Sequence, residues 1–218
     1  GFFYNSILHA MQISLISPIK NDIDNLTKHP LFERFEIQPE KILFSKFPNG
    51  FKGLLRIIIG QQISFKTADI LWLRACNLAY GEENITPEWV LNQNSLILKS
   101  IGLSNQKQAY VRKLAESITL GEFDSSHIDN LKDEYIIEKI SKLYGFGIWS
   151  AQMYCMLCLA RPNILPQNDL AVNKTLQSLY GTGHTLDYKQ ILQKTKKFEG
   201  AYSAFTLILW YLYIKKVI

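Results

Sequence analysis

Two glycines one residue apart, Gly145 and Gly147, interrupt an otherwise helical pattern. Apolar residues recur at helical spacing over residues 134–143, and an apolar helix resumes near Ile148. Because glycine permits a left-handed backbone and close chain approach, this pattern predicts a tight hairpin between two helices. The amides at the start of the second helix would then form a site for an anion such as phosphate. An ordinary helix–helix turn that ends on glycine explains the pattern equally well.

The rest of the chain is also dominated by helical patterns. The apolar spacing, capping residues and turn signals predict helices over residues 21–28, 51–59, 64–80, 104–120, 169–180, 187–197 and 200–216, and a further short helix that starts at residues 86–89. Alternating residues in 11–18 suggest one short edge strand. No repeat or long linker interrupts the series. The sequence therefore predicts an all-α protein of about ten helices.

Length and charge set broad limits on the class of protein. A chain of 218 residues is long enough for one domain or for two closely packed subdomains. Lysine and arginine number 24 against 19 aspartates and glutamates, which leaves a formal net charge of +5. This excess permits a nucleic-acid partner without requiring one.

The three cysteines indicate an intracellular protein without a disulfide framework. Cys155 and Cys158 form a C-x-x-C pattern, but they lie in an apolar helix, where we expect core packing rather than metal binding. We find no signal peptide, and Met11 is a candidate native start that would make residues 1–10 an extension. The apolar run 201–214 is too short to cross a bilayer, so we expect a buried helix and no membrane partner. The expected location is the cytoplasm or the nucleoid.

Three ordered segments carry a family resemblance. They are I-I-I-G-Q-Q-I-S at 57–64, L-Y-G-F-G-I-W-S-A at 143–151, and R-P-N-I-L-P-Q-N-D-L-A at 161–171, which contains Asp169. Together they resemble the helix-hairpin-helix DNA glycosylase superfamily, and within it the alkylbase glycosylases of the bacterial 3-methyladenine DNA glycosylase II type. The resemblance covers roughly residues 50–175.

The resemblance implies a fold and a set of partners. Two helical subdomains would flank a DNA-binding cleft, with residues 55–165 forming a helical barrel that carries the hairpin, and residues 11–54 plus 166–218 forming the second subdomain. The expected partner is double-stranded DNA that contains damaged bases, bound by a monomer. No cysteine follows Cys158, so the iron–sulfur cluster of some superfamily members is not expected. No metal or cofactor is expected, and a monovalent cation at the hairpin is left open.

Asp169 is the candidate catalytic residue. Cleavage of an N-glycosidic bond develops positive charge at the sugar, which a fixed carboxylate stabilises. The same carboxylate can orient or activate the attacking water. Aspartate is also one of the best helix N-caps, so a purely structural role is the alternative. The loop and hairpin around it favour catalysis, and the two roles are compatible.

The resemblance also implies two sets of contact residues. Gln62 aligns with the side chain that fills the gap left by a flipped base, although a plain polar loop is the alternative. The candidate DNA-binding residues are Gln61, Gln62, Ser64, Gly145, Gly147, Ser150 and Lys174. The candidate base-pocket residues are Trp149, Met153 and Tyr154, with Met153 standing where some relatives have an aromatic residue. Trp72 and Trp210 are further aromatic candidates, and for both of them, as for Tyr154, core packing is the more natural interpretation.

Trp149 also stands where bifunctional members carry the lysine that forms a Schiff base, so we expect a monofunctional, hydrolytic enzyme. Bases that carry a positive charge leave readily and stack on aromatic faces, which favours 3-methyladenine and 7-methylguanine as substrates. Two alternatives stay open. One is a non-catalytic helix-hairpin-helix DNA-binding module, which would have no need of Asp169, and the other is a glycosylase for a neutral damaged base.

Overall fold

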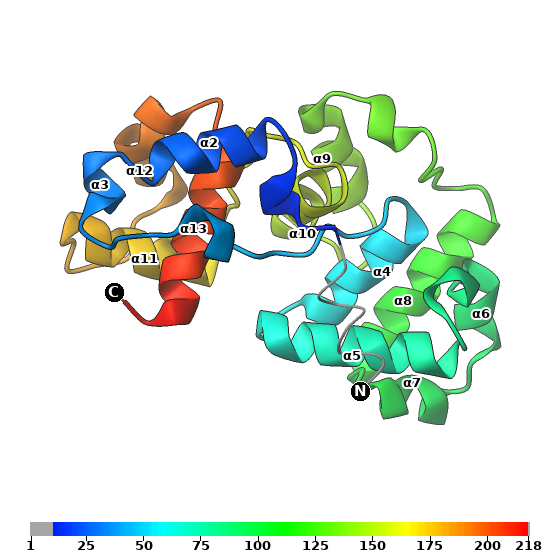
Figure 1. Cartoon of the computed structure of the whole chain (residues 1–218). Coiled ribbons are helices and arrows are strands. Elements are labelled where there is room, and N and C mark those ends of the chain that lie inside the picture. Colours follow the sequence, from blue (N-terminus) through cyan, green and yellow to red (C-terminus); the bar gives the residue numbers. More distant parts are fainter. Residues whose placement is uncertain (1–10, 218) are drawn as a thin grey trace. The chain divides into compact units, whose positions relative to one another are not determined.

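The computed structural model describes residues 11–217 and consists of helices and loops within that range (Figure 1). Its one deviation is an isolated antiparallel bridge between Gln12 and Ser45. The predicted all-α class is therefore confirmed. The question of an N-terminal extension over residues 1–10 lies outside the described residues.

The described chain forms two compact units. Unit 1 is Phe47–Tyr154, and unit 2 combines residues 11–46 with residues 155–217. The sequence placed the corresponding borders later in the chain, at 55 and 165. The helices of unit 1 are α4 (Phe51–Gly60), α5 (Phe65–Leu78), η3 (Glu82–Asn84), α6 (Pro87–Asn92), α7 (Ser95–Ile101), α8 (Asn105–Thr119), η4 (Ile128–Asn130), α9 (Asp133–Ser141) and α10 (Ile148–Met153). Those of unit 2 are η1 (Ile13–Leu15), α2 (Ile19–Leu26), α3 (Pro30–Glu33), η2 (Pro39–Lys41), α11 (Leu170–Tyr180), α12 (Tyr188–Thr195), η6 (Lys196–Phe198) and α13 (Tyr202–Lys215), and η5 (Tyr154–Cys158) joins the two along the chain.

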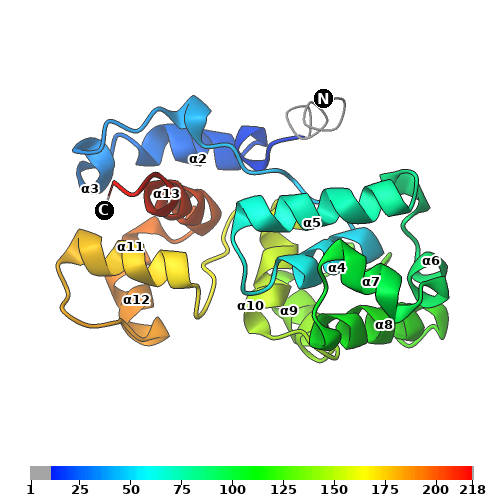
Figure 2. The same cartoon turned by 90° about the horizontal axis from the view of Figure 1, so that it is seen from below.

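Helix α4 forms the centre of unit 1. It packs against α5, α8 and α10 (Figure 2), and Leu54, Ile58 and Ile59 are almost completely buried. Because its sequence is apolar on nearly every side, such a helix is stable only when other helices surround it. Ser64 caps the next helix, α5, as its position in the sequence predicted.

Helix α13 has the same central role in unit 2, where it packs against α2 and α11. Trp210 and Phe205 are fully buried, and the Phe205 ring stacks on Phe198 with 4.4 Å between ring centroids. The prediction that the run 201–214 is a buried helix is confirmed. In the part of the chain that the structure describes, we find no helix whose length and apolar character would suit a membrane span.

The predicted edge strand over residues 11–18 is wrong. Ile13–Leu15 forms a short 3₁₀ turn, and both Ile13 and Ser14 are buried, so the alternation does not separate an inner face from an outer face. The backbone contact with the segment near Phe44 stops after the single bridge. A strand needs a longer partner ladder than this segment finds.

Among the described residues, two short α-helices, α3 and α7, were not predicted. At α3, the pair His29-Pro30 ends the predicted helix over residues 21–28, but Pro30 also occupies the first turn of a new helix, which His29 caps through Nδ1. Helix α7 lies between Asn94, which caps its start, and Gly102, which ends it in the left-handed region. Both segments are too short to show a helical period in the sequence.

Cys155 and Cys158 are fully buried in η5, so the prediction of core packing is confirmed. The preceding residue, Tyr154, is also fully buried. Its hydroxyl donates to Oδ1 of Asp129 and accepts from the amide of Gly50, both at 2.8 Å. The Tyr154 hydroxyl thus ties the turn before α4 to η4 within unit 1.

We expect Tyr154→Phe to lower the free energy of unfolding by about 1–3 kcal/mol, because the Gly50 amide loses its acceptor in a partly buried place. Urea unfolding followed by circular dichroism measures the change. Tyr135→Phe is the matched control, since Tyr135 is 57% exposed, and it should alter stability by less than about 0.5 kcal/mol. Equal stability of the two variants would contradict the role of the Tyr154 hydroxyl.

Candidate functional site

The two hairpin glycines have different surroundings. Gly145 has a φ of +85°, and a Cβ atom there would collide with the ring of Tyr110. Glycine is therefore required at this position by both backbone and packing. Gly147 has a φ of −123°, and a Cβ atom there would meet nothing within 4 Å. The fold alone therefore does not require glycine at position 147. The open space beside this residue can admit a group of a bound partner.

The backbone around Gly147 is open at the start of α10. Gly147 is the exposed N-cap residue, and as a glycine it has no side chain with which to cap this helix. The first amides of a helix need acceptors and carry partial positive charge. This geometry suits a phosphate, as the glycine pattern predicted.

Gln61 joins the loop after α4 to this hairpin. Its side-chain Nε2 donates to the carbonyl of Gly145 at 2.9 Å and to Oγ of Ser150 at 3.1 Å. The structure thus brings together three residues that the sequence grouped only by resemblance. It also gives Gln61 and the buried Ser150 an intramolecular role that the sequence did not predict.

Gln62 and Ser64 differ from Gln61 in their surroundings. Gln62 is exposed and has a φ of +57°, a left-handed conformation uncommon for a residue with a side chain. Ser64 accepts a hydrogen bond from the amide of Thr67 at 3.2 Å as the cap of α5. Gln62 therefore presents its side chain to solvent, and Ser64 already uses its oxygen within the protein.

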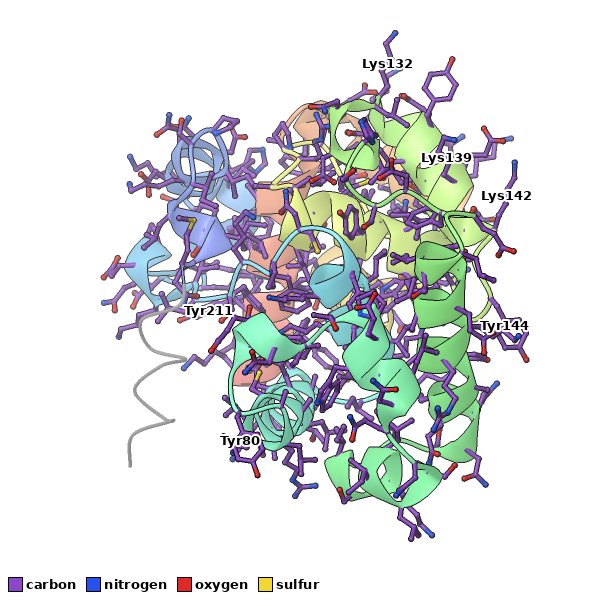
Figure 3. All side chains as sticks on the ribbon, turned by 90° about the vertical axis from the view of Figure 1, so that its right-hand side faces the viewer. Tyr80, Lys132, Lys139, Lys142, Tyr144 and Tyr211 are labelled. Atoms are coloured by element: carbon purple, nitrogen blue, oxygen red, sulfur yellow. The ribbon has the colours of Figure 1, made fainter. Side chains whose placement is uncertain are left out.

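Positively charged side chains extend outward along α9 beside the hairpin. Figure 3 shows Lys132, Lys139 and Lys142 pointing away from the protein, with Tyr144 of the hairpin on the same side. Lys142 pairs with Glu138 at 2.6 Å, and this pairing holds the pKa of the Glu138 carboxyl below its ordinary value. The same helix also carries three carboxylates, so the surface beside the hairpin bears charges of both signs, and its exposed lysines are the candidate contacts for an anion.

Asp169 is a buried carboxylate with defined partners. It caps α11, and its Oδ1 accepts from the amide of Val172 at 2.9 Å and from Nε1 of Trp210 at 3.2 Å. The preceding residue, Asn168, has a φ of +56°, which asparagine tolerates better than most residues. The predicted capping role is confirmed, and these contacts fix the orientation of the carboxyl group.

Trp210 was considered only as a core or pocket aromatic, and its hydrogen bond to Asp169 was missed. The two residues are 41 positions apart, and no local sequence signal links an indole N–H to a given carboxylate. A tryptophan buried in a helix does need a partner for its N–H group, so a buried acceptor was the one available clue.

The three base-pocket candidates are unequally placed. At most 1% of the surface of Met153 and of Tyr154 is exposed to solvent, whereas Trp149 is partly exposed. Trp149 is therefore the best placed of the three to meet a ligand.

Lys174 is exposed on the second turn of α11. Among residues 11–217, no group of three His, Cys, Asp or Glu side chains is arranged to hold a metal ion.

Comparison with known proteins identifies the family. Residues 55–199 match the family described as HhH-GPD superfamily base excision DNA repair protein. The chain therefore belongs to the HhH-GPD superfamily, which confirms the resemblance seen in the sequence.

Individual relatives are distant in sequence. DNA-3-methyladenine glycosylase 1 of Schizosaccharomyces pombe is 24% identical over 144 residues, which are 66% of this chain and 62% of that protein, so the match spans less than two thirds of this relative. The crystal structure of a Bacillus halodurans DNA-3-methyladenine glycosidase is similar with a TM-score of 0.67 and 26% identity, over 90% of this chain and 89% of that one. A Clostridium acetobutylicum 8-oxoguanine glycosylase/lyase bound to double-stranded DNA shares the fold, with a TM-score of 0.75 and 18% identity over 95% and 73% of the chains.

We expect Gly147→Leu to weaken DNA binding about tenfold for all sequences alike, because contacts to phosphates position a protein without reading bases. The salt dependence of binding should become shallower by about one phosphate contact. Fluorescence anisotropy at several salt concentrations measures both quantities. The unfolding free energy should change by less than about 0.5 kcal/mol, because the added side chain meets open space.

Gly183→Leu serves as the control, since a Cβ atom at Gly183 also meets nothing within 4 Å and this glycine lies far along the chain in unit 2. A Gly147→Leu variant that binds DNA with the affinity and salt slope of the control would exclude a phosphate at this helix start.

Proposed function

We propose that this protein is a monofunctional DNA glycosylase that removes alkylated purines, 3-methyladenine and 7-methylguanine, from double-stranded DNA by hydrolysis. The observation that carries the proposal is Asp169, a buried carboxylate oriented by Val172 and Trp210 in a chain of the HhH-GPD superfamily. A module that only grips DNA has no need of such a carboxylate. The names of the S. pombe and B. halodurans relatives support the alkylated-base assignment.

In the proposed reaction the bond between C1′ of the deoxyribose and the base nitrogen breaks, and its electron pair leaves with the base. Positive charge develops on the sugar, and the Asp169 carboxylate stabilises that charge electrostatically. Water then adds to C1′ and loses a proton to the carboxylate or to solvent. A base methylated at N3 or N7 already carries a positive charge, so it leaves without being protonated by the enzyme.

Unit 1 supplies most of the proposed DNA contacts. The amides after Gly147 and the exposed lysines of α9 bind backbone phosphates, and Lys174 on α11 of unit 2 adds a further phosphate contact. Gln62, exposed at the tip of its loop, enters the duplex and fills the gap left by the flipped nucleotide. The exposed part of Trp149 stacks on the cationic base. One chain acts on one site, without a cofactor.

The proposed reaction is hydrolytic because Trp149 occupies the hairpin position where bifunctional members carry a lysine. Without an amine at that place, a Schiff base with the sugar has no carrier. The lysine nearest to Asp169 in the sequence is Lys174, five residues later. It is assigned to a phosphate contact, because it is exposed and lies on the second turn of α11.

Asp169→Asn should lower base excision by about a thousandfold, a barrier increase of ~4 kcal/mol, because the amide keeps the size of the side chain but removes its charge. The rate of release from methylated DNA under single-turnover conditions is the measurement. Asparagine is also a good N-cap, so the stability of α11 should be nearly unchanged.

Asp187→Asn is the matched control for this change. Asp187 caps α12 and accepts from the amide of Gln190 at 2.8 Å, so the same substitution alters a second aspartate cap. It should leave excision unchanged. Residual activity of Asp169→Asn within about tenfold of wild type would remove Asp169 from the catalytic role.

Chromatography of bases freed from DNA that contains methylated, oxidised and deaminated lesions tests the substrate class. Release of 3-methyladenine and 7-methylguanine should be much faster than release of 8-oxoguanine or uracil, because the charged bases are better leaving groups. Borohydride should trap no covalent complex, and the product strands should stay intact until alkali is added. Faster release of the neutral bases, or a trapped complex that depends on Lys174, would overturn the alkylated-base or the monofunctional assignment respectively.

A further inference from the structure

Lys107 of α8 forms hydrogen bonds with the last turn of α4 and the loop that follows it. No pattern in the sequence predicts this contact. Its Nζ donates to the carbonyl of Ile59 and to the carbonyl of Gln61, both at 2.7 Å. The side chain is half-buried, and burial lowers the pKa of its ammonium group from the ordinary value. The last carbonyls of a helix lack intrahelical donors, and a cation placed there also interacts favourably with the helix dipole.

The Gln61 carbonyl belongs to the peptide unit that connects Gln61 to Gln62. A hydrogen bond to this carbonyl fixes the orientation of that peptide plane, and with it the φ of Gln62. Gln62 has a φ of +57°, which a glutamine keeps only when its surroundings hold it there. Lys107 acts directly on this constraint, because its ammonium group is the donor to the carbonyl immediately before Gln62.

The same residue, Gln61, is bound to the hairpin through its side chain. Its Nε2 reaches the Gly145 carbonyl and Ser150 Oγ. Lys107, Gln61 and the hairpin therefore form one continuous set of hydrogen bonds inside unit 1, and the exposed Gln62 projects from it.

We propose that Lys107 is a positioning residue that holds Gln62 in the conformation that enters the duplex. This inference rests on the proposed function, in which Gln62 fills the gap left by a flipped base. Lys107 itself does not touch the substrate. Its loss should therefore impair the insertion of Gln62 into the duplex more than it impairs DNA binding.

The experiment compares Lys107→Met, which keeps the length of the side chain but removes its donors, with Lys107→Arg, which keeps the charge and the donors. Lys113→Met is the matched control, because it removes one lysine charge from the same helix at a side chain that is 61% exposed. The probe is a duplex with a tetrahydrofuran abasic analogue opposite 2-aminopurine, whose fluorescence rises when local stacking is disturbed. Anisotropy with the same duplex reports affinity and salt dependence.

Lys107→Met should lose most of the fluorescence rise at saturating protein, about fivefold, while its affinity stays within about threefold of that of the Lys113→Met control. Lys107→Arg should recover the signal to within about twofold. In a Gln62→Ala background, Lys107→Met should cause no further loss, because both changes remove the same inserted side chain. If Lys107→Met does not fold, Lys107→Gln, which keeps a polar group in the half-buried position, is subjected to the same measurements.

A full fluorescence rise in Lys107→Met or Lys107→Gln, or losses that add to those of Gln62→Ala, would overturn the positioning role. Neither readout requires base excision, so the outcome is separable from the test of the proposed function. A wild-type protein that disturbs the duplex but releases no methylated base would contradict the proposed function and leave the role of Lys107 standing. Normal excision with an unchanged Lys107→Met signal would contradict the role of Lys107 alone.

Discussion

The hydrogen bonds from the Gln61 side chain to the hairpin are the interaction on which the candidate DNA-binding face of unit 1 depends. They connect the end of α4, the most deeply buried helix of the unit, to the Gly145 carbonyl and to Ser150 at the start of α10. A hairpin rich in glycine has a large conformational entropy to lose when it binds an anion. Attachment to a rigid buried helix lowers that loss before any partner arrives, as preorganisation does in other binding sites.

Hydrogen bonds also fix the orientation of the candidate catalytic carboxylate in unit 2. Asp169 begins α11, and its Oδ1 meets the Val172 amide and the Trp210 indole, both within the core of the unit. Carboxyl groups in water rotate freely, whereas this one has its orientation set by two donors from different helices. Capping and chemistry are thus not competing explanations for Asp169, because the contacts that make it a good cap also make it a fixed charge.

Several features of the site could be predicted from the sequence because they depend on neighbours in the chain. The hairpin, the cap at Asp169 and the exposure of Gln62 follow from glycine spacing, capping preference and a polar interruption between helices. The edge strand at 11–18 failed for the converse reason, since a strand depends on a partner that the segment itself does not encode. Helix α3 was not predicted because a proline that ends one helix can also begin the next.

By itself, then, the sequence determined the helical class through local periodicity and the order of the motifs through short-range spacing, and the resemblance of those motifs to a known superfamily indicated the family. Only the tertiary structure distinguished Gly145, which is pressed against the Tyr110 ring, from Gly147, which faces open space. It also decided that Lys107 binds the carbonyls of Ile59 and Gln61 instead of solvent. The physical reason is the same in each case: hydrogen bonds and van der Waals contacts act over a few ångströms in space, so residues far apart in the chain acquire their roles only when folding brings them together.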